Sequence, residues 1–167
     1  MINKFNFFEN MTKDSNYDST NDTLKHIKRV DDLLKMAASE LLHRGEIHDD
    51  SKLKTPEKEL FDELTPMLAK LTYGSEEYTA SLAKLKPALD HHYQENSHHP
   101  EHYSNGINDM DLFDVIEMFF DWKAASERHT DGDIGKSIDI NKNRFKMSEQ
   151  LHSIFKNTAI NLGYIKK

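Results

Sequence analysis

The stretch "HDDSK", residues 48–52, places two groups that can bind a metal ion close to a cation. The imidazole of His48 adjoins the carboxylate of Asp49, and Lys52 follows three residues after that carboxylate. Imidazole and carboxylate are ligands for divalent transition metals, whereas a protonated lysine has donors only and cannot ligate. The same residues also fit a solvated loop in which Lys52 pairs with Asp49 or Asp50. Other parts of the sequence have to distinguish these two interpretations.

A second acidic pattern lies in "LFDVIEMFFDW", residues 112–122. Eight of its eleven residues are apolar and point in nearly every direction, which predicts a buried helix. Asp114, Glu117 and Asp121 are spaced three and four apart and therefore share one face. Three buried like charges repel and lose their hydration, so a cation is needed beside them. The alternative is the wet face of a surface helix, with Arg128 pairing the acids.

Histidine is unusually frequent and unevenly distributed. The chain has ten, and five of them lie between residues 91 and 102, namely His91, His92, His98, His99 and His102. Histidine is the commonest metal ligand and titrates near neutral pH. We expect at least two of the five to face one cavity, where they bind a second metal ion or a substrate phosphate. The alternative is a polar loop whose histidines occur by chance.

Composition restricts the class of protein. The absence of cysteine leaves His, Asp, Glu and water as metal ligands. A formal net charge of -7 argues against duplex nucleic acid as the main partner. No apolar run approaches the roughly 18 residues of a membrane span, and the N-terminus lacks the features of a signal peptide. We therefore expect a cytoplasmic protein without a membrane partner.

The spacing of apolar residues predicts helices throughout. The first expected helix covers residues 22–44, and the second is capped by Thr55 with Pro56 in first position. A third runs from Ser75 to about 96 with a kink at Pro87, and a fourth covers 112–128. Helical sequence then runs from Ser137 to before Gly163, with a break near 147–148. No alternating strand pattern appears. The predicted fold is all-α, a single helical domain over residues 21–167, preceded by a flexible arm over 1–20 whose Phe5, Phe7 and Phe8 dock on the domain.

Taken together, these residues resemble the HD-domain superfamily of metal-dependent phosphohydrolases. Its pattern is a histidine on an early helix, an adjacent His-Asp pair and a distant aspartate, matched here by His26, His48-Asp49 and Asp121. "HDDSK" also resembles its form "HD-x-x-K". The stretch "HHPEHYSNG" resembles the histidine-rich loop that supplies extra ligands in two-metal members. More closely, residues 23–160 look like an uncharacterised family of short HD-like proteins from phages and bacteria, with similar "HD-x-S-K", "HHPEHY" and "DW-K-A" signatures.

The resemblance implies an all-helical bundle of the HD type and a metal site. The implied ligands are His26, His48, Asp49 and Asp121, joined by His92 and His98. By itself, the helical placement of His26 beside an apolar stripe is more typical of a structural histidine. One or two ions of Mn, Fe, Co, Ni or Zn would fit these donors. Bound metal would polarise a phosphoryl oxygen and lower the pKa of a water for attack.

The resemblance also implies roles for residues outside the ligand set. Lys52 would neutralise charge on the phosphate, and Glu117 would orient or deprotonate the water. Arg128, His99 and His102 would contact the substrate. With Asp49 counted among the catalytic groups, the predicted function is a metal-dependent phosphohydrolase acting on a nucleotide or related small phosphate ester.

Two other functions fit the same residues. One is an HD-type di-iron oxygenase, which iron content and oxygen dependence would distinguish. The other is a non-catalytic protein that sequesters a nucleotide or blocks a host factor, which would show no turnover. The expected partner is a small phosphorylated substrate such as a nucleotide, and a homo-oligomer is also open. The compartment is the host cytoplasm if a phage encodes the protein.

Overall fold

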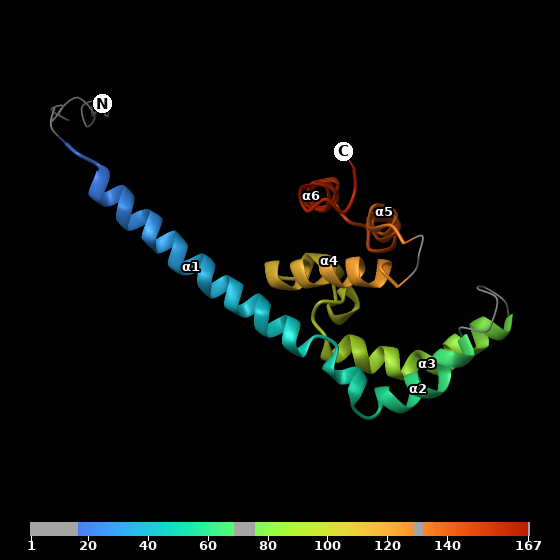
Figure 1. Ribbon diagram of the computed structural model, residues 1–167. Coiled ribbons are helices and arrows are strands. Elements are labelled where there is room, and N and C mark those ends of the chain that lie inside the picture. The colour runs from blue at the N-terminus through green and yellow to red at the C-terminus, as the bar shows by residue number, and fades with distance from the viewer. Residues whose placement is uncertain (1–16, 69–75, 129–131, 167) are drawn as a thin grey trace, which may run out of the picture. The chain divides into compact units, whose positions relative to one another are not determined.

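A computed structural model describes residues 17–68, 76–128 and 132–166 (Figure 1). The chain divides into two compact units, residues 1–39 and 40–167, and each is described by itself. This division falls inside the first helix, whereas the sequence predicted an arm over 1–20 and a domain over 21–167. Phe5, Phe7 and Phe8 lie outside the described residues.

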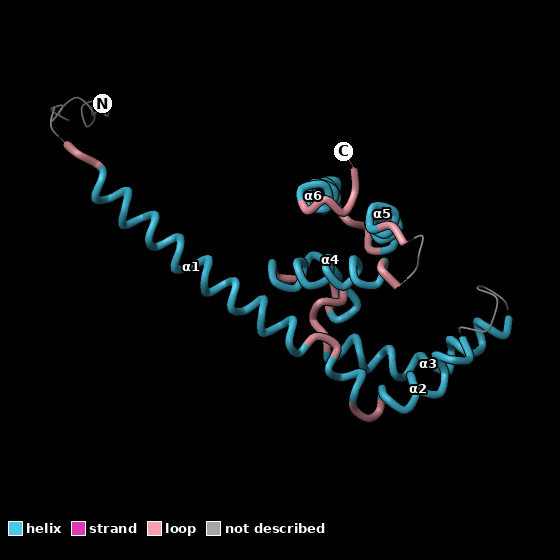
Figure 2. Tube along the Cα trace, in the orientation of Figure 1, coloured by secondary structure: helices cyan, strands magenta, loops and turns pink. Residues whose placement is uncertain are grey.

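All regular structure in the described ranges is helical, which confirms the all-α prediction (Figure 2). The α-helices are α1 (Thr20–Ile47), α2 (Glu57–Leu68), α3 (Glu76–Glu95), α4 (Leu112–Ser126), α5 (Ile134–Arg144) and α6 (Glu149–Asn161). Three short 3-10 helices join them: η1 (Asp50–Leu53), η2 (Pro100–His102) and η3 (Gly106–Asp109). Among the described helices, none is both long and apolar enough to cross a membrane.

Capping residues explain where the helices of the second unit begin. Asp111 and Asp114 form a capping box at the start of α4, each side chain accepting from the other residue's backbone N–H. Ser148 caps α6 through the N–H of Leu151, which confirms the break near 147–148. The side chains at these positions satisfy N–H groups that the first helical turn leaves without partners.

The predicted starts of two other helices were wrong by one to three residues. Asp133 caps α5 by accepting from the N–H groups of Gly135 and Lys136, so this helix begins before Ser137. Aspartate is as good an N-cap as serine, so residue type does not favour Ser137 over Asp133 as the start of this helix. Helix α2 begins at Glu57, so Pro56 precedes it. Ser75 lies outside the described residues.

Two hydrophobic clusters hold the second unit together. The larger joins α4, α5 and α6 and consists of Met118, Phe119, Trp122, Ile134, Ile138, Met147, Phe155 and Ala159. The smaller joins α2 and α3 through Leu64, Leu85 and Ala88. Helix α4 is not buried on all sides as predicted, because Leu112 and Phe120 are 71% and 44% exposed. Its remaining apolar residues are enough to fill the larger cluster.

Truncating the larger cluster should destabilise the protein. Ile138 is fully buried, so Ile138→Ala removes buried methyl groups and leaves a cavity, and the free energy of unfolding should fall by about 2–5 kcal/mol. The matched control is Ile154→Ala on α6, which is 57% exposed and should change it by less than about 0.5 kcal/mol. Urea unfolding measures both variants, and equal effects would contradict this assignment of the core.

Candidate metal centre

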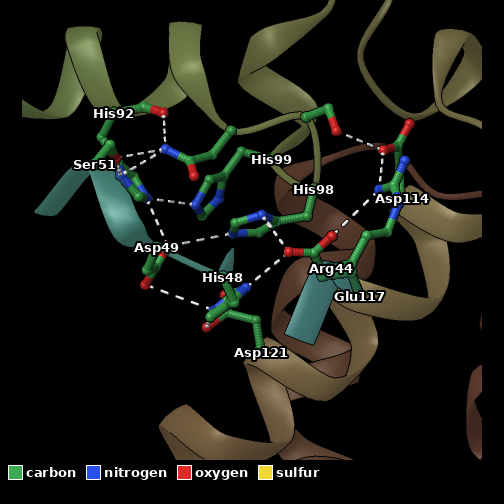
Figure 3. A network of polar contacts seen from close by, with 12 residues as sticks. Arg44, His48, Asp49, Ser51, His92, His98, His99, Asp114, Glu117 and Asp121 are labelled. Atoms are coloured by element: carbon green, nitrogen blue, oxygen red, sulfur yellow. Dashed lines mark hydrogen bonds and ion pairs between the residues drawn. The ribbon is translucent and has the colours of Figure 1, made fainter. Parts of the chain in front are cut away.

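The His48–Asp49 pair lies in the turn between α1 and η1. Asp49 has a φ of 59°, in the left-handed region. Aspartate and asparagine are among the few residues other than glycine that tolerate this conformation. The turn redirects the chain immediately after α1, and Figure 3 shows both side chains within one polar network. A strained backbone at adjacent potential ligands is typical of functional sites.

Side chains from several elements converge on this pair. Three groups bring their potential ligand atoms within 4.8 Å of one another: Asp49, His92, His98 and His99; His48, Asp49 and Asp121; and His48, His98 and Glu117. They come from the turn after α1, from α3, from the loop before η2 and from α4. Five of the six ligands implied by the resemblance therefore lie together, and His99 joins them.

The distances between these atoms suit coordination of a metal ion. Asp49 Oδ1 lies 3.2 Å from His92 Nε2 and 3.6 Å from His98 Nε2. Asp49 Oδ2 and Asp121 Oδ1 lie 3.6 Å and 3.7 Å from His48 Nε2. Two ligands that are each about 2.0–2.2 Å from one ion are roughly 3–3.5 Å apart. The cluster already has nearly this spacing.

Two buried atoms of the cluster have no hydrogen-bond partner among the residues that the structure describes. They are Asp49 Oδ1 and His98 Nε2, which lie close together and inside the protein. A buried polar atom without a partner costs about 1–3 kcal/mol, and most such atoms in folded proteins are satisfied. A cation would satisfy a carboxylate oxygen and an imidazole lone pair at once. These residues can therefore hold a metal ion.

Glu117 orients two of the imidazoles. Its Oε1 lies 2.8 Å from His48 Nδ1 and 3.1 Å from His98 Nδ1. A carboxylate only accepts hydrogen bonds, so these rings carry protons on Nδ1. Glu117 Oε2 accepts from Arg44 Nη1 at 3.2 Å. With both oxygens engaged, Glu117 fits a positioning role better than the expected action on water.

Glu57 does the same for a second pair of histidines. It is fully buried, and its two oxygens lie 2.8 Å from His91 Nδ1 and 2.9 Å from His92 Nδ1. His92 Nε2 is thereby directed toward Asp49. Carboxylates in this position fix the orientation of ligand histidines in metal sites. The sequence analysis missed Glu57, because an acid in the first turn of a helix is already explained by the helix dipole.

Asp114 anchors the loop that carries His98 and His99. It is 2% exposed and accepts from Arg44 at 2.8 Å, from Ser97 Oγ at 2.7 Å and from Tyr103 Oη at 2.6 Å. The acidic stripe of α4 is therefore not a wet surface. Its cation is Arg44, which the sequence analysis did not single out, and not Arg128, which is exposed.

The charges of the cluster shift the ionisation of its members. Hydrogen bonds to Asp121 and Glu117 raise the pKa of His48 to about 10, although burial opposes them. Burial, followed by the neighbouring His98 and His92, lowers the pKa of His99 to about 3. Burial would raise the pKa of Asp49, but His92 and Lys52 outweigh it and hold that pKa well below its usual range. Asp49 and His99 are thus in the protonation states that metal binding requires, whereas His48 has to lose the proton on Nε2 when it binds a metal ion.

The other predicted residues lie as follows. Lys52 Nζ donates to Asp49 Oδ2 at 2.6 Å, and its role toward a phosphate stays a prediction. His102 is exposed and donates from Nδ1 to the carbonyl of Tyr93. His26 is exposed on α1 and belongs to none of the three groups found among the described residues. Its ligation of metal stays a prediction, as does contact of His102 with substrate.

Two cavities of the second unit border the cluster. Cavity A, of about 580 Å³, is lined among others by Arg44, His48, Ser51, His91, His98 and Glu117. Cavity B, of about 410 Å³, is lined among others by Tyr93, His99, Asp121, Trp122, Lys136 and Phe145. His91 and His98 both line cavity A, so the expectation that two of the five clustered histidines face one cavity is confirmed.

Comparison with known proteins identifies a family but no activity. A family described as "Family of unknown function (DUF5662)" matches residues 15–161. The chain belongs to this family. No curated protein and no solved structure matched the chain. The matched range includes every residue of the candidate centre, and what that centre does has to be argued from its geometry.

Replacing the shared carboxylate should remove metal binding. Asp49→Asn keeps the shape and tolerates the left-handed backbone, but it loses the negative charge that faces His92 and His98. We expect its affinity for Zn²⁺ or Mn²⁺, measured by calorimetry, to fall more than 100-fold. This is more than the roughly 10–100-fold loss expected when a residue that only orients a metal ligand is replaced. The control is Asp50→Asn, whose carboxylate is half exposed and approaches only Lys54 at 4.0 Å. Equal affinities in the two variants would contradict the assignment.

Replacing Glu57, which orients His91 and His92, should weaken metal binding without abolishing it. Glu57→Gln presents an amide to one of the two Nδ1–H groups, which disturbs the orientation of one ring. The expected loss of metal affinity is about 10–100-fold. Glu63→Gln, on the exposed face of the same helix, is the control. Thermal unfolding of both variants in chelator separates a change in affinity from a loss of fold.

Proposed function

We propose that this protein is a metal-dependent phosphohydrolase of the HD type that acts on a nucleotide or related small phosphate ester. The observation that carries the proposal is the position of Asp49. Its Oδ1 faces His92 and His98, whereas its Oδ2 faces His48. Asp49 would be able to hold metal together with His92 and His98 through one oxygen and together with His48 through the other. Paired ions are a recurring arrangement for displacement at phosphorus.

The chain's own residues would divide the work around such a centre. Bound metal would supply a polarised phosphoryl oxygen and a water of lowered pKa. Glu57 and Glu117 hold the imidazoles with Nε2 toward the ligand cluster. Lys52 is about one third exposed beside Asp49, so its ammonium can neutralise a phosphate that approaches the cluster from solvent. Neutralisation in a site shielded from water lowers the barrier more than in bulk solvent.

Phosphate release is the direct test of this function. Metal-loaded protein is incubated with a panel of nucleotides and sugar phosphates, and released phosphate is measured before and after chelation. We expect release that chelator abolishes, that added Mn²⁺ or Co²⁺ restores, and that Asp49→Asn lacks. Tight nucleotide binding without release would favour a sequestering protein. Iron-dependent oxygen consumption would favour an oxygenase. Either outcome would overturn the proposal.

Lys52 separates a phosphohydrolase from a bare metal site. Lys52→Ala should keep its metal and its fold but lose about 10²–10³ in turnover, because the phosphoryl charge loses a preorganised cation. The control is Lys58→Ala, which breaks only an exposed pair with Asp62 and should leave turnover unchanged. Metal content is measured alongside the phosphate-release rate. Near-normal turnover of the metal-loaded Lys52 variant would be compatible with the assigned metal ligands. It would contradict the role of Lys52 in neutralising the phosphoryl charge.

A further inference from the structure

Cavity B opens onto the candidate centre from the side of Asp121. His99 and Asp121 line it, and each belongs to one of the groups of potential metal ligands. The remaining walls come from α3, α4 and α5. Its volume of about 410 Å³ falls within the range of roughly 300–1,000 Å³ that small-molecule sites occupy. A ligand in this cavity would have one end at the metal centre.

Aromatic side chains form one wall of cavity B. The rings of Trp122 and Phe145 lie parallel, with an interplanar angle of 5° and centroids 6.1 Å apart. The ring of Tyr93 lies 5.1 Å from that of His99. Flat aromatic surfaces favour stacking with a planar ring of a ligand. The hydrophobic cluster includes Trp122 and packs against Phe145, so these two rings are held in place before any ligand binds.

The cations of cavity B differ in availability. Arg144 is held by Glu101 at 2.6 Å and lies over the ring of Phe145. Lys136 is exposed, and among the residues that the structure describes it makes no ion pair. Asp133 also lines the cavity, but its carboxylate caps α5 and accepts two backbone N–H groups. Lys136 can therefore turn to an anionic ligand without breaking an existing pair.

Cavity A is less suited to an anion. Its guanidinium, Arg44, already contacts the carboxylates of Glu40, Asp114 and Glu117, and its lysine, Lys54, lies 4.0 Å from the carboxylate of Asp50, which lines the same cavity. Glu117 also engages the Nδ1 atoms of His48 and His98, so the potential ligand atoms of these rings are directed away from it. A phosphate in cavity A would lie near the carboxylates of Glu40 and Glu117, and the positive charge of Arg44 is already paired with them. The two cavities thus differ in charge and in the side of the imidazoles that they border.

From these observations we propose that cavity B binds a nucleoside monophosphate. The base packs on the wall of Tyr93, Trp122 and Phe145, and the phosphate is directed to the end that holds His99 and Asp121, where Lys136 neutralises part of its charge. The carboxylate of Asp121 repels a phosphate when no cation lies between them, so tight binding requires the loaded metal centre. This inference rests on the proposed function and adds the substrate class and the subsite.

The single tryptophan of the chain makes the inference directly measurable. Because Trp122 lines the cavity, its fluorescence reports on a ligand there. Zinc-loaded protein is titrated with adenosine 5′-monophosphate, adenosine and inorganic phosphate. We expect a saturable change with the monophosphate and at least tenfold weaker binding of either fragment. Lys136→Ala should weaken binding of the monophosphate on the order of tenfold, the size of a lost charge-assisted hydrogen bond, and leave adenosine unchanged.

A matched variant and separate readouts make the outcomes distinct. Lys142→Ala lies on the same helix but pairs with Glu149, and it should bind the monophosphate like the parent protein. Phosphate release from nucleotides with no response of Trp122 and no effect of Lys136→Ala would overturn the subsite and leave the proposed function intact. A saturable, Lys136-dependent response without phosphate release would support the subsite and overturn the hydrolase. Adenosine binding as tightly as its monophosphate would overturn the assigned phosphate end.

Discussion

Four carboxylates that lie partly or fully inside the protein set the conditions for the rest of the second unit. Asp49, Asp114, Glu117 and Asp121 would repel one another and lose hydration if no positive charge accompanied them. Arg44 supplies charge to Asp114 and Glu117, and His48, with its raised pKa, supplies it to Glu117 and Asp121. The end of α1 and the acidic face of α4 are held together by this requirement.

Packing and polar contacts have separate tasks in this arrangement. The two hydrophobic clusters fix α2 against α3 and α4 against α5 and α6, and none of the potential metal ligands belongs to either cluster. The ligands instead come from the turn and loop residues that join these helices, and from the polar edges of α3 and α4. Buried carboxylates then fix the rings, Glu57 for His92 and Glu117 for His48 and His98. An imidazole held in this way loses little rotational freedom when it binds a ligand.

The potential metal ligands border two cavities on different sides. Cavity A borders Glu117, which holds the rings of His48 and His98, and cavity B borders Asp121 and His99 beside an aromatic wall. A site whose supporting contacts lie on one side leaves its other side open for a ligand. If cavity B binds the proposed nucleotide, the phosphate lies on the side of Lys136, which makes no ion pair with the residues that the structure describes.

The sequence by itself determined what depends on local chemistry. Apolar spacing predicted the helices and the break near 147–148, and residue type with helical spacing singled out His48, Asp49, Asp121 and the histidines near 92 and 98. Only the tertiary structure decided the partners. Arg44 pairs with Asp114 across 70 residues of chain, whereas the local pattern pointed to Arg128, seven residues after Asp121. Glu57 faces His91 and His92, and the two oxygens of Asp49 face different ligands, because these contacts follow from how helices pack and no local pattern encodes them.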